Sequence, residues 1–118
     1  MRDHTQLRVF AMADQLALLV YRETQAFPDS ERFGLQSQVR RAAVSIAANI
    51  VEGCARSSHA DYVRFLNIAY GSARELQYEL DLCRRLGFIS AENAKTLNDD
   101  CTTTAKALNT LLRALRKT

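Results

Sequence analysis

The spacing of apolar residues between positions 62 and 87 constrains the fold of this chain more than any other feature. The positions follow one another at alternating steps of four and three residues: Tyr62, Leu66, Ala69, Ala73, Leu76, Leu80, Cys83 and Gly87. Such steps place side chains on one face of an α-helix. A repeat sustained over this length is typical of a helix that packs lengthwise against other helices. We therefore expect a long helix that ends at Gly87, because glycine favours helix C-termini.

Three further segments repeat this helical pattern, and none shows the alternation of a strand. The expected helices cover about residues 5–25, 35–52, 58–87 and 91–116. The expected core positions outside the third helix are Val9, Ala13, Leu16, Val20, Leu35, Val39, Ala42, Ile46, Ile50, Ala94, Leu97, Cys101, Thr104, Leu108, Leu111 and Leu115. Gly53 is expected to end the second helix, and Ser58 and Ser90 to cap the third and fourth. Amphipathic helices joined by short connections predict an all-α, antiparallel up-down-up-down four-helix bundle.

Length and composition place few other limits on the chain. Its 118 residues predict one domain over 1–118, and its formal charge of +3 is only mildly basic. The first residues lack a signal-peptide pattern, and the longest apolar run, 16–21, is too short to cross a membrane, so we expect a cytoplasmic protein. The three cysteines include no CxxC pair. Cys83 and Cys101 are expected in the core, and Cys54 in a more exposed turn.

A polar stripe runs beside the core face of the second helix. It consists of Arg41, Ser45, Asn49 and Glu52, and a similar flank of the third helix carries Ser72, Glu75 and Glu79. A polar group left unpaired at a core margin costs about 1–3 kcal/mol. One interpretation is a network between the two helices, for example with Arg41 bound to Glu75 or Glu79. The other is pairing across a subunit interface, and the two can coexist.

Small residues in the middle of the third helix predict a close contact. Gly71 precedes Ser72 and Ala73 there, and glycine inside a helix costs about 0.5–1 kcal/mol relative to alanine. Close approach by another helix would offset this cost. The second helix is rich in alanine, so we expect Gly71 and Ala73 to pack against Ala42 and Ala43.

Several runs of residues resemble one protein family. They are 33–35, 38–46 and 49–53 in the second helix, 56–57, 61–66 and 69–76 after it, and Phe27-Pro28 before it. Together they resemble the signature of the 23S rRNA-intervening-sequence protein family, also called the four-helix bundle protein family. The match is strong over about residues 7–87, whereas the fourth helix matches only in its periodicity.

The resemblance carries expectations that the residues alone do not. It implies a left-handed four-helix bundle that assembles into a ring-like homopentamer. Some members of the family are encoded within insertions in bacterial 23S rRNA genes. The fold is shared with accessory proteins of diversity-generating retroelements, which form basic pentameric barrels and bind reverse transcriptase and nucleic acid. Most members of the family have no established biochemical role.

No catalytic pattern emerges from the sequence. It contains no HExxH, P-loop or GxSxG motif, and the ExxH spacing of di-iron bundles is missing. His4 lies near a terminus and His59 at a helix start, where solvation accounts for both. We therefore predict no catalytic residue, metal site, cofactor, small-molecule substrate or membrane association.

Two classes of partner besides the chain itself stay open. The nucleic-acid hypothesis uses the basic residues Arg32, Arg40, Arg56, Arg113, Arg116 and Lys117. In a pentamer the formal charge of +3 would become +15, which would attract RNA if the charge gathered on one face. Basic residues in a last helical turn, however, also complement the helix dipole. The alternative is an assembly and interaction scaffold that binds a protein partner.

Overall fold

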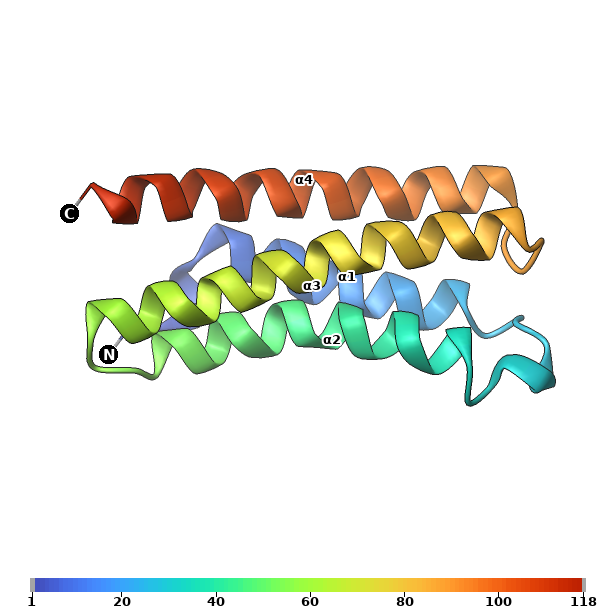
Figure 1. Ribbon diagram of the computed structural model, residues 1–118, viewed down its shortest axis with the longest axis horizontal. Helices are drawn as coiled ribbons and strands as arrows, with labels where there is room; N and C mark the ends of the chain where they lie inside the picture. The colour runs from blue at the N-terminus through green and yellow to red at the C-terminus, as the bar shows by residue number, and fades with distance from the viewer. Residues whose placement is uncertain (1, 118) are drawn as a thin grey trace.

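Four long helices carry most of the chain in the computed structural model, which describes residues 2–117. They are α1 (Arg8–Glu23), α2 (Leu35–Cys54), α3 (His59–Arg85) and α4 (Ala91–Arg116), with short 3₁₀ helices η1 (His4–Gln6) and η2 (Asp29–Glu31). Successive helices run in opposite directions, and the described residues form no strand (Figure 1). This confirms the predicted all-α, up-down-up-down bundle.

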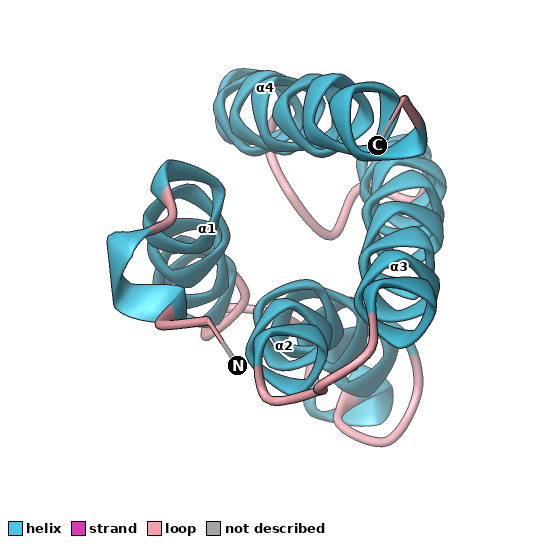
Figure 2. Ribbon diagram, turned by 90° about the vertical axis from the view of Figure 1, so that its left-hand side faces the viewer, coloured by secondary structure: helices cyan, strands magenta, loops and turns pink. Residues whose placement is uncertain are grey.

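The helices surround the bundle axis in the order of the sequence. Each helix contacts the one before it and the one after it, and α1 and α4 close the circle (Figure 2). The bundle measures 45 × 22 × 19 Å. The contact between α2 and α3 is the most extensive, and the contact between α1 and α4 is the least. The facing sides of α2 and α3 are therefore the most extensively packed pair of helix faces in the bundle.

The predicted caps of α3 and α4 are confirmed. Ser58 Oγ accepts a hydrogen bond from the backbone N–H of Asp61 at 3.1 Å, and Ser90 Oγ caps α4 in the same way. Gly87 has a φ of +80°, and the N–H of Phe88 donates to the carbonyl of Cys83 at 3.0 Å. This is the hydrogen-bond pattern of a Schellman motif, which needs a left-handed residue that glycine supplies without strain.

The expectation that Gly53 stops α2 is wrong. Gly53 lies within the last turn of α2, which continues to Cys54, and its φ is not positive. A Cβ atom at Gly53 would lie 3.1 Å from the Cβ of Phe65 and 3.3 Å from the carbonyl oxygen of Tyr62. Glycine therefore lets α3 approach the backbone of α2 closely. Cys54, which we expected to be more exposed, is also buried.

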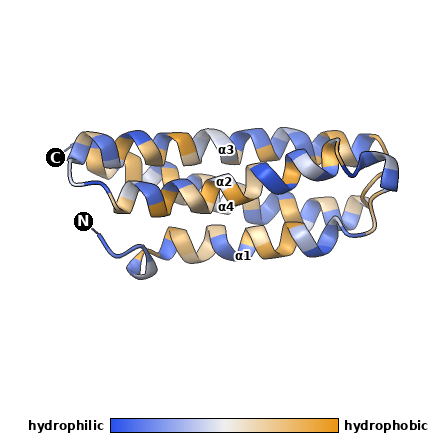
Figure 3. Cartoon of the chain, turned by 90° about the horizontal axis from the view of Figure 1, so that it is seen from below, coloured by the Kyte–Doolittle hydropathy of each residue, from blue (hydrophilic) through white to orange (hydrophobic). Residues whose placement is uncertain are grey.

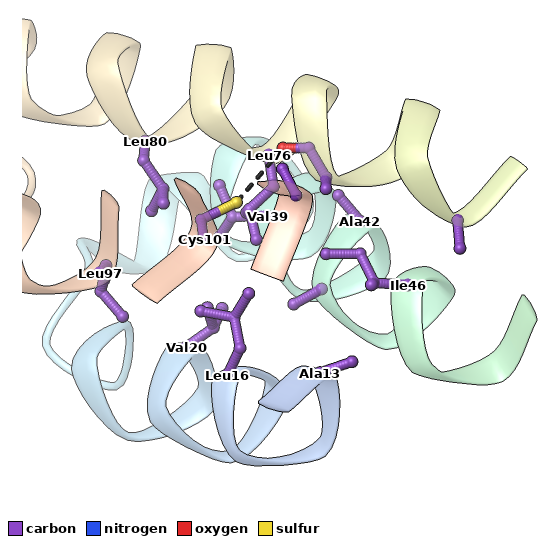
Figure 4. Close-up of a cluster of buried hydrophobic side chains, with 14 of the residues drawn as sticks. Ala13, Leu16, Val20, Val39, Ala42, Ile46, Leu76, Leu80, Leu97 and Cys101 are labelled. Carbon is purple, nitrogen blue, oxygen red and sulfur yellow. Dashed lines mark hydrogen bonds between the residues drawn. The ribbon is translucent and has the colours of Figure 1, made fainter. Parts of the chain in front are cut away.

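The core contains almost all of the predicted positions (Figure 4). One difference lies near the end of α4, where Leu112 is fully buried while Leu111 and Leu115 are only partly buried. A helix of 3.6 residues per turn drifts relative to a seven-residue repeat, so the buried stripe moves by one position along a long helix. Hydrophobic and hydrophilic residues accordingly alternate in short stretches along every helix (Figure 3).

The buried cysteines act as core side chains. Burial raises the pKa of Cys101 to about 12 and that of Cys83 to about 11, so both remain thiols. Cys101 Sγ donates to the carbonyl oxygen of Ala73 at 3.2 Å, which links α4 to α3 (Figure 4).

Candidate interaction surface on helices α2 and α3

One hydrogen bond between α2 and α3 joins the centre of the polar stripe, and Asn49 supports it from within α2. Ser45 Oγ lies 2.8 Å from Ser72 Oγ across the two helices. Asn49 Nδ2 donates to the carbonyl oxygen of Ser45 at 2.8 Å and to Ser45 Oγ at 3.0 Å. All three side chains are half-buried. These residues therefore fix the position of α2 against α3 within one chain.

The ends of the stripe behave differently from its centre. Glu52 forms an ion pair with Arg56, one turn further along the chain. Arg41 is exposed and forms no ion pair or hydrogen bond with another residue of the described range 2–117. The bond between Arg41 and Glu75 or Glu79, which the sequence offered as one interpretation, is thus not formed within the chain.

Two carboxyl groups lie together on α3, and no cation in the described part of the chain pairs with either of them. Glu79 is only 5% exposed, and its Oε1 atom has no hydrogen-bond partner among the described residues. Burial, a hydrogen bond with Glu75 and the charge of Glu75 raise the pKa of Glu79 to about 7. Glu79 is therefore partly protonated near neutral pH.

Gly71 does not make the contact that the sequence predicted. Ala42, Ala43 and Ala73 are buried as expected, but Gly71 is exposed and a Cβ atom there would meet nothing within 4 Å. The reason is the phase of α3, since Ala73 takes the core position and Gly71, two residues earlier, falls on the outer side. Nothing within residues 2–117 packs against Gly71 to offset the cost of this glycine.

Exposed apolar side chains accompany Gly71, and sequence reasoning missed them. Val44 is 44% exposed, Ile68 42% and Tyr78 61%. On α3, Ile68, Gly71, Glu75 and Tyr78 follow one another at steps of three and four and so share one face. Their signal in the sequence was a second, weaker apolar stripe outside the core seam. We call the surface made by Arg41, Val44, Ala48, Ile68, Gly71, Glu75, Tyr78 and Glu79 the α2–α3 face.

Several arginines that the sequence proposed for nucleic acid have partners within the chain. Arg40 Nε donates to Thr24 Oγ1 at 2.9 Å and Arg40 Nη2 to the carbonyl oxygen of Tyr21 at 3.2 Å, at the C-terminal end of α1. Arg56 pairs with Glu52 and lies over the ring of Phe65.

Arg32 is exposed beside Phe33. It lines an open groove of about 800 Å³ together with Arg40 and Arg41. Among Arg32, Arg40 and Arg56, the arginines near α2 that the sequence proposed for nucleic acid, Arg32 is thus the one whose guanidinium has no polar partner in residues 2–117.

The remaining predicted cations gather at the other end of the bundle. The C-terminal turn of α4 lies beside the start of α3, where His59 Nε2 is 3.1 Å from the carbonyl oxygen of Leu115. Arg113, Arg116 and Lys117 are exposed there, and Arg116 Nη2 donates to Asn67 Oδ1 at 3.3 Å. Arg56 lies at this same end, in the turn between α2 and α3 (Figure 1). Arg32 and Arg40 lie near the opposite end, so the six predicted residues do not form one face.

Neither a metal site nor a membrane-spanning segment is found. Within residues 2–117, no three His, Cys, Asp or Glu side chains are placed so that they could hold a metal ion. None of the helices in that range has the length and apolar character needed to span a bilayer.

Comparison with known proteins places the chain in a family. The model of the 23S rRNA-intervening sequence protein matches residues 5–110. No protein of curated function matches the sequence. A crystal structure from Bacteroides thetaiotaomicron VPI-5482, of a protein with unknown function from the S23 ribosomal protein family, aligns with a TM-score of 0.80 and 30% identity. The alignment covers 88% of this chain and 97% of that one. The chain therefore belongs to the 23S rRNA-intervening sequence protein family.

Proposed function

We propose that this protein is a subunit of a homo-oligomeric interaction scaffold in the cytoplasm and has no catalytic activity of its own. Gly71 carries this proposal. It lies in the interior of α3, where glycine costs about 0.5–1 kcal/mol relative to alanine. A Cβ atom would fit there without any contact. A neighbour outside the chain that approaches the helix backbone closely accounts for glycine at this position.

The surroundings of Gly71 support the same proposal. Exposed Ile68 and Tyr78 lie on the same side of α3, and Val44 is exposed on the neighbouring helix α2. Apolar and aromatic side chains of this kind are enriched at the centres of protein interfaces. The resemblance to the family makes a ring of five copies the expected assembly, with a further protein as its partner.

The molar mass in solution tests the proposed assembly. We expect light scattering at micromolar concentration to give a multiple of the 13.3 kDa chain, and five chains if the family's ring is formed. A mass of one chain at every concentration up to the millimolar range would contradict the proposal.

A second candidate function is RNA binding by the basic end of the bundle. Arg113, Arg116 and Lys117 are exposed at the end of α4, near Arg56. Several copies side by side in a ring would bring these cations together, which would raise the affinity for a polyanion.

Salt-dependent binding to a 23S rRNA fragment tests this second function. We expect the affinity to fall steeply with salt, because bound cations displace counterions from phosphates. A triple variant with Arg113, Arg116 and Lys117 changed to Gln should bind more weakly and with a shallower slope. Arg32→Gln, at the opposite end, is the matched control. No binding at low salt, or equal effects of both variants, would exclude the basic end as an RNA site.

A further inference from the structure

The α2–α3 face carries two charged groups that the chain itself leaves unmatched. Arg41 on α2 is exposed and has no partner within residues 2–117. Glu75 and Glu79 lie one turn apart on α3, and neither forms an ion pair within that range. The other charged pairs of the chain, by contrast, are short-range pairs within single helices or their ends, such as Lys95 with Asp99.

The carboxyl pair has the geometry of an incomplete binding site. Glu79 is only 5% exposed, yet its Oε1 atom has no hydrogen-bond partner among the described residues. Glu75, one turn earlier, is exposed. A buried acceptor left unsatisfied costs about 1–3 kcal/mol. A guanidinium seated on Glu75 would supply positive charge to both carboxyl groups, and its planar donors match carboxylate oxygens.

We propose that Arg41 on α2 of one copy binds the Glu75–Glu79 carboxyl pair on α3 of a second copy and so joins α2 of one chain to α3 of the next. This inference rests on the proposed homo-oligomer and names the face and the charged contact that build it. A second copy is the occupant because one surface bears both halves of the ion pair, a cation on α2 and an acceptor on α3. Because the two halves lie on different helices, each copy can offer its cation to one neighbour and its carboxyl pair to another, which is the repeated contact that closes a ring.

The apolar residues of the α2–α3 face also suit contact with a second copy of the chain. Ile68 and Gly71 are exposed on α3, and Ala48 is exposed on α2. Small side chains let the backbones of two chains approach closely, while Val44 and Tyr78 provide the apolar area. The charged contact then lies at the margin of an apolar patch, where it fixes the register of the two copies.

Charge reversal tests the contact. Arg41→Glu and Glu75→Arg should each weaken self-association by about tenfold or more, because each places like charges opposite one another. The double variant should regain most of the wild-type affinity. An equimolar mixture of the two single variants should also associate, since the reversed charges meet only between different chains. Lys106→Glu on α4 is the matched control and should leave self-association unchanged.

The outcomes separate this inference from the proposed function. A wild-type protein that is always a single chain overturns both. A wild-type protein that assembles, with single variants that assemble equally well, overturns only the Arg41 contact and leaves the scaffold in place. Loss of assembly in each single variant without recovery in the double variant or the mixture also contradicts the contact, because it indicates general damage. Circular dichroism of each variant verifies that the bundle is folded.

Glu79 provides a second measurement. Glu79→Gln keeps the size of the side chain and removes its charge, so it should preserve the fold and weaken self-association by several-fold. Asp100→Asn on α4 is the neutral control of the same kind. Equal affinities for the two variants and the wild-type protein would show that Glu79 has no part in the contact.

Discussion

Gly53 and Gly71 lie in adjacent helices, and their surroundings are opposite. A Cβ atom at Gly53 would press on Phe65 and on the backbone of Tyr62, whereas one at Gly71 would meet nothing. The first glycine serves packing within the chain. The second makes no close contact with the part of the chain that the structure describes, which is why we assign it to an external contact.

Alanine substitutions should therefore change stability in opposite directions. Gly53→Ala should lower the free energy of unfolding by about 1 kcal/mol, since overpacking of about 1–3 kcal/mol exceeds the helix-propensity gain. Gly71→Ala should raise the free energy of unfolding of the single chain by about 0.5–1 kcal/mol. It should also weaken self-association. Urea denaturation of dilute protein checks stability, and light scattering checks association. The same sign for both stability changes would contradict this assignment.

Glu79 makes stability depend on pH near neutrality. Its pKa rises from 4.5 to about 7 on folding, so the folded chain holds more protons than the unfolded chain between these values. Stability is therefore greatest at the acidic end of this window and is lost as pH rises through 7. Above pH 7 the buried carboxylate is ionised beside Glu75.

We expect dilute wild-type protein to be less stable at pH 8 than at pH 5 by on the order of 2 kcal/mol from this group. Glu79→Gln should remove most of this difference and be the more stable protein at pH 8. Urea denaturation at pH 5 and at pH 8 measures this difference in stability. Glu92→Gln, at the exposed start of α4, should keep the wild-type difference. A variant at Glu79 with an unchanged pH dependence would show that another group is responsible.

At the scale of the elements, Arg40 fastens the end of α1 to α2. Its two hydrogen bonds reach Thr24 and the carbonyl of Tyr21, and its guanidinium lies 4.5 Å from the ring centre of Tyr21. Thr24 is itself buried and donates to the carbonyl of Val20 at 2.7 Å. The shortest of the four helices is thus held at its C-terminus by a side chain that sequence reasoning assigned to nucleic acid.

Arg40→Lys should destabilise the bundle by about 1–2 kcal/mol, because an ammonium group cannot replace both hydrogen bonds and the stacking. Arg32→Lys is the matched control and should change stability by less than about 0.5 kcal/mol. Hydrogen exchange should show faster opening at the C-terminal end of α1 in the Arg40 variant alone. Equal stability of the two variants would contradict this role.

At the scale of the whole molecule, the exposed apolar residues lie on different sides of the bundle. Ile68 is on the α2–α3 face, whereas Leu18 is 51% exposed on α1. If the α2–α3 face joins copies, burial of Ile68 stabilises the assembled state, and stability depends on protein concentration.

We expect the melting temperature of the wild-type protein to rise with concentration over two orders of magnitude. Ile68→Glu should remove this dependence, because burial of an unpaired charge in the interface is unfavourable. Leu18→Glu should preserve it. Scanning calorimetry at several concentrations measures the effect. The opposite pattern for the two variants would place the interface on α1.

Much of the fold was predictable because it depends on local patterns. The four-and-three spacing identified the helices, and Ser58, Ser90 and Gly87 marked ends that the structure confirms. Capping and periodicity act over a few residues, so they can be recognised without knowledge of neighbours. The polar stripe could likewise be recognised from its regular spacing, although the partners of its members could not.

The sequence by itself determined an antiparallel bundle and the faces that fill its core. Only the tertiary structure decided that Gly53 meets α3, that Gly71 meets nothing, and that Arg40 binds the end of α1 while Arg41 remains unpaired. These outcomes depend on how far each helix is rotated about its axis and how closely it approaches its neighbour. A difference of one position moves a side chain by more than a quarter of a turn, about 100°. Helical periodicity defines the buried side of each helix, but packing against the neighbours sets which flanking residues meet.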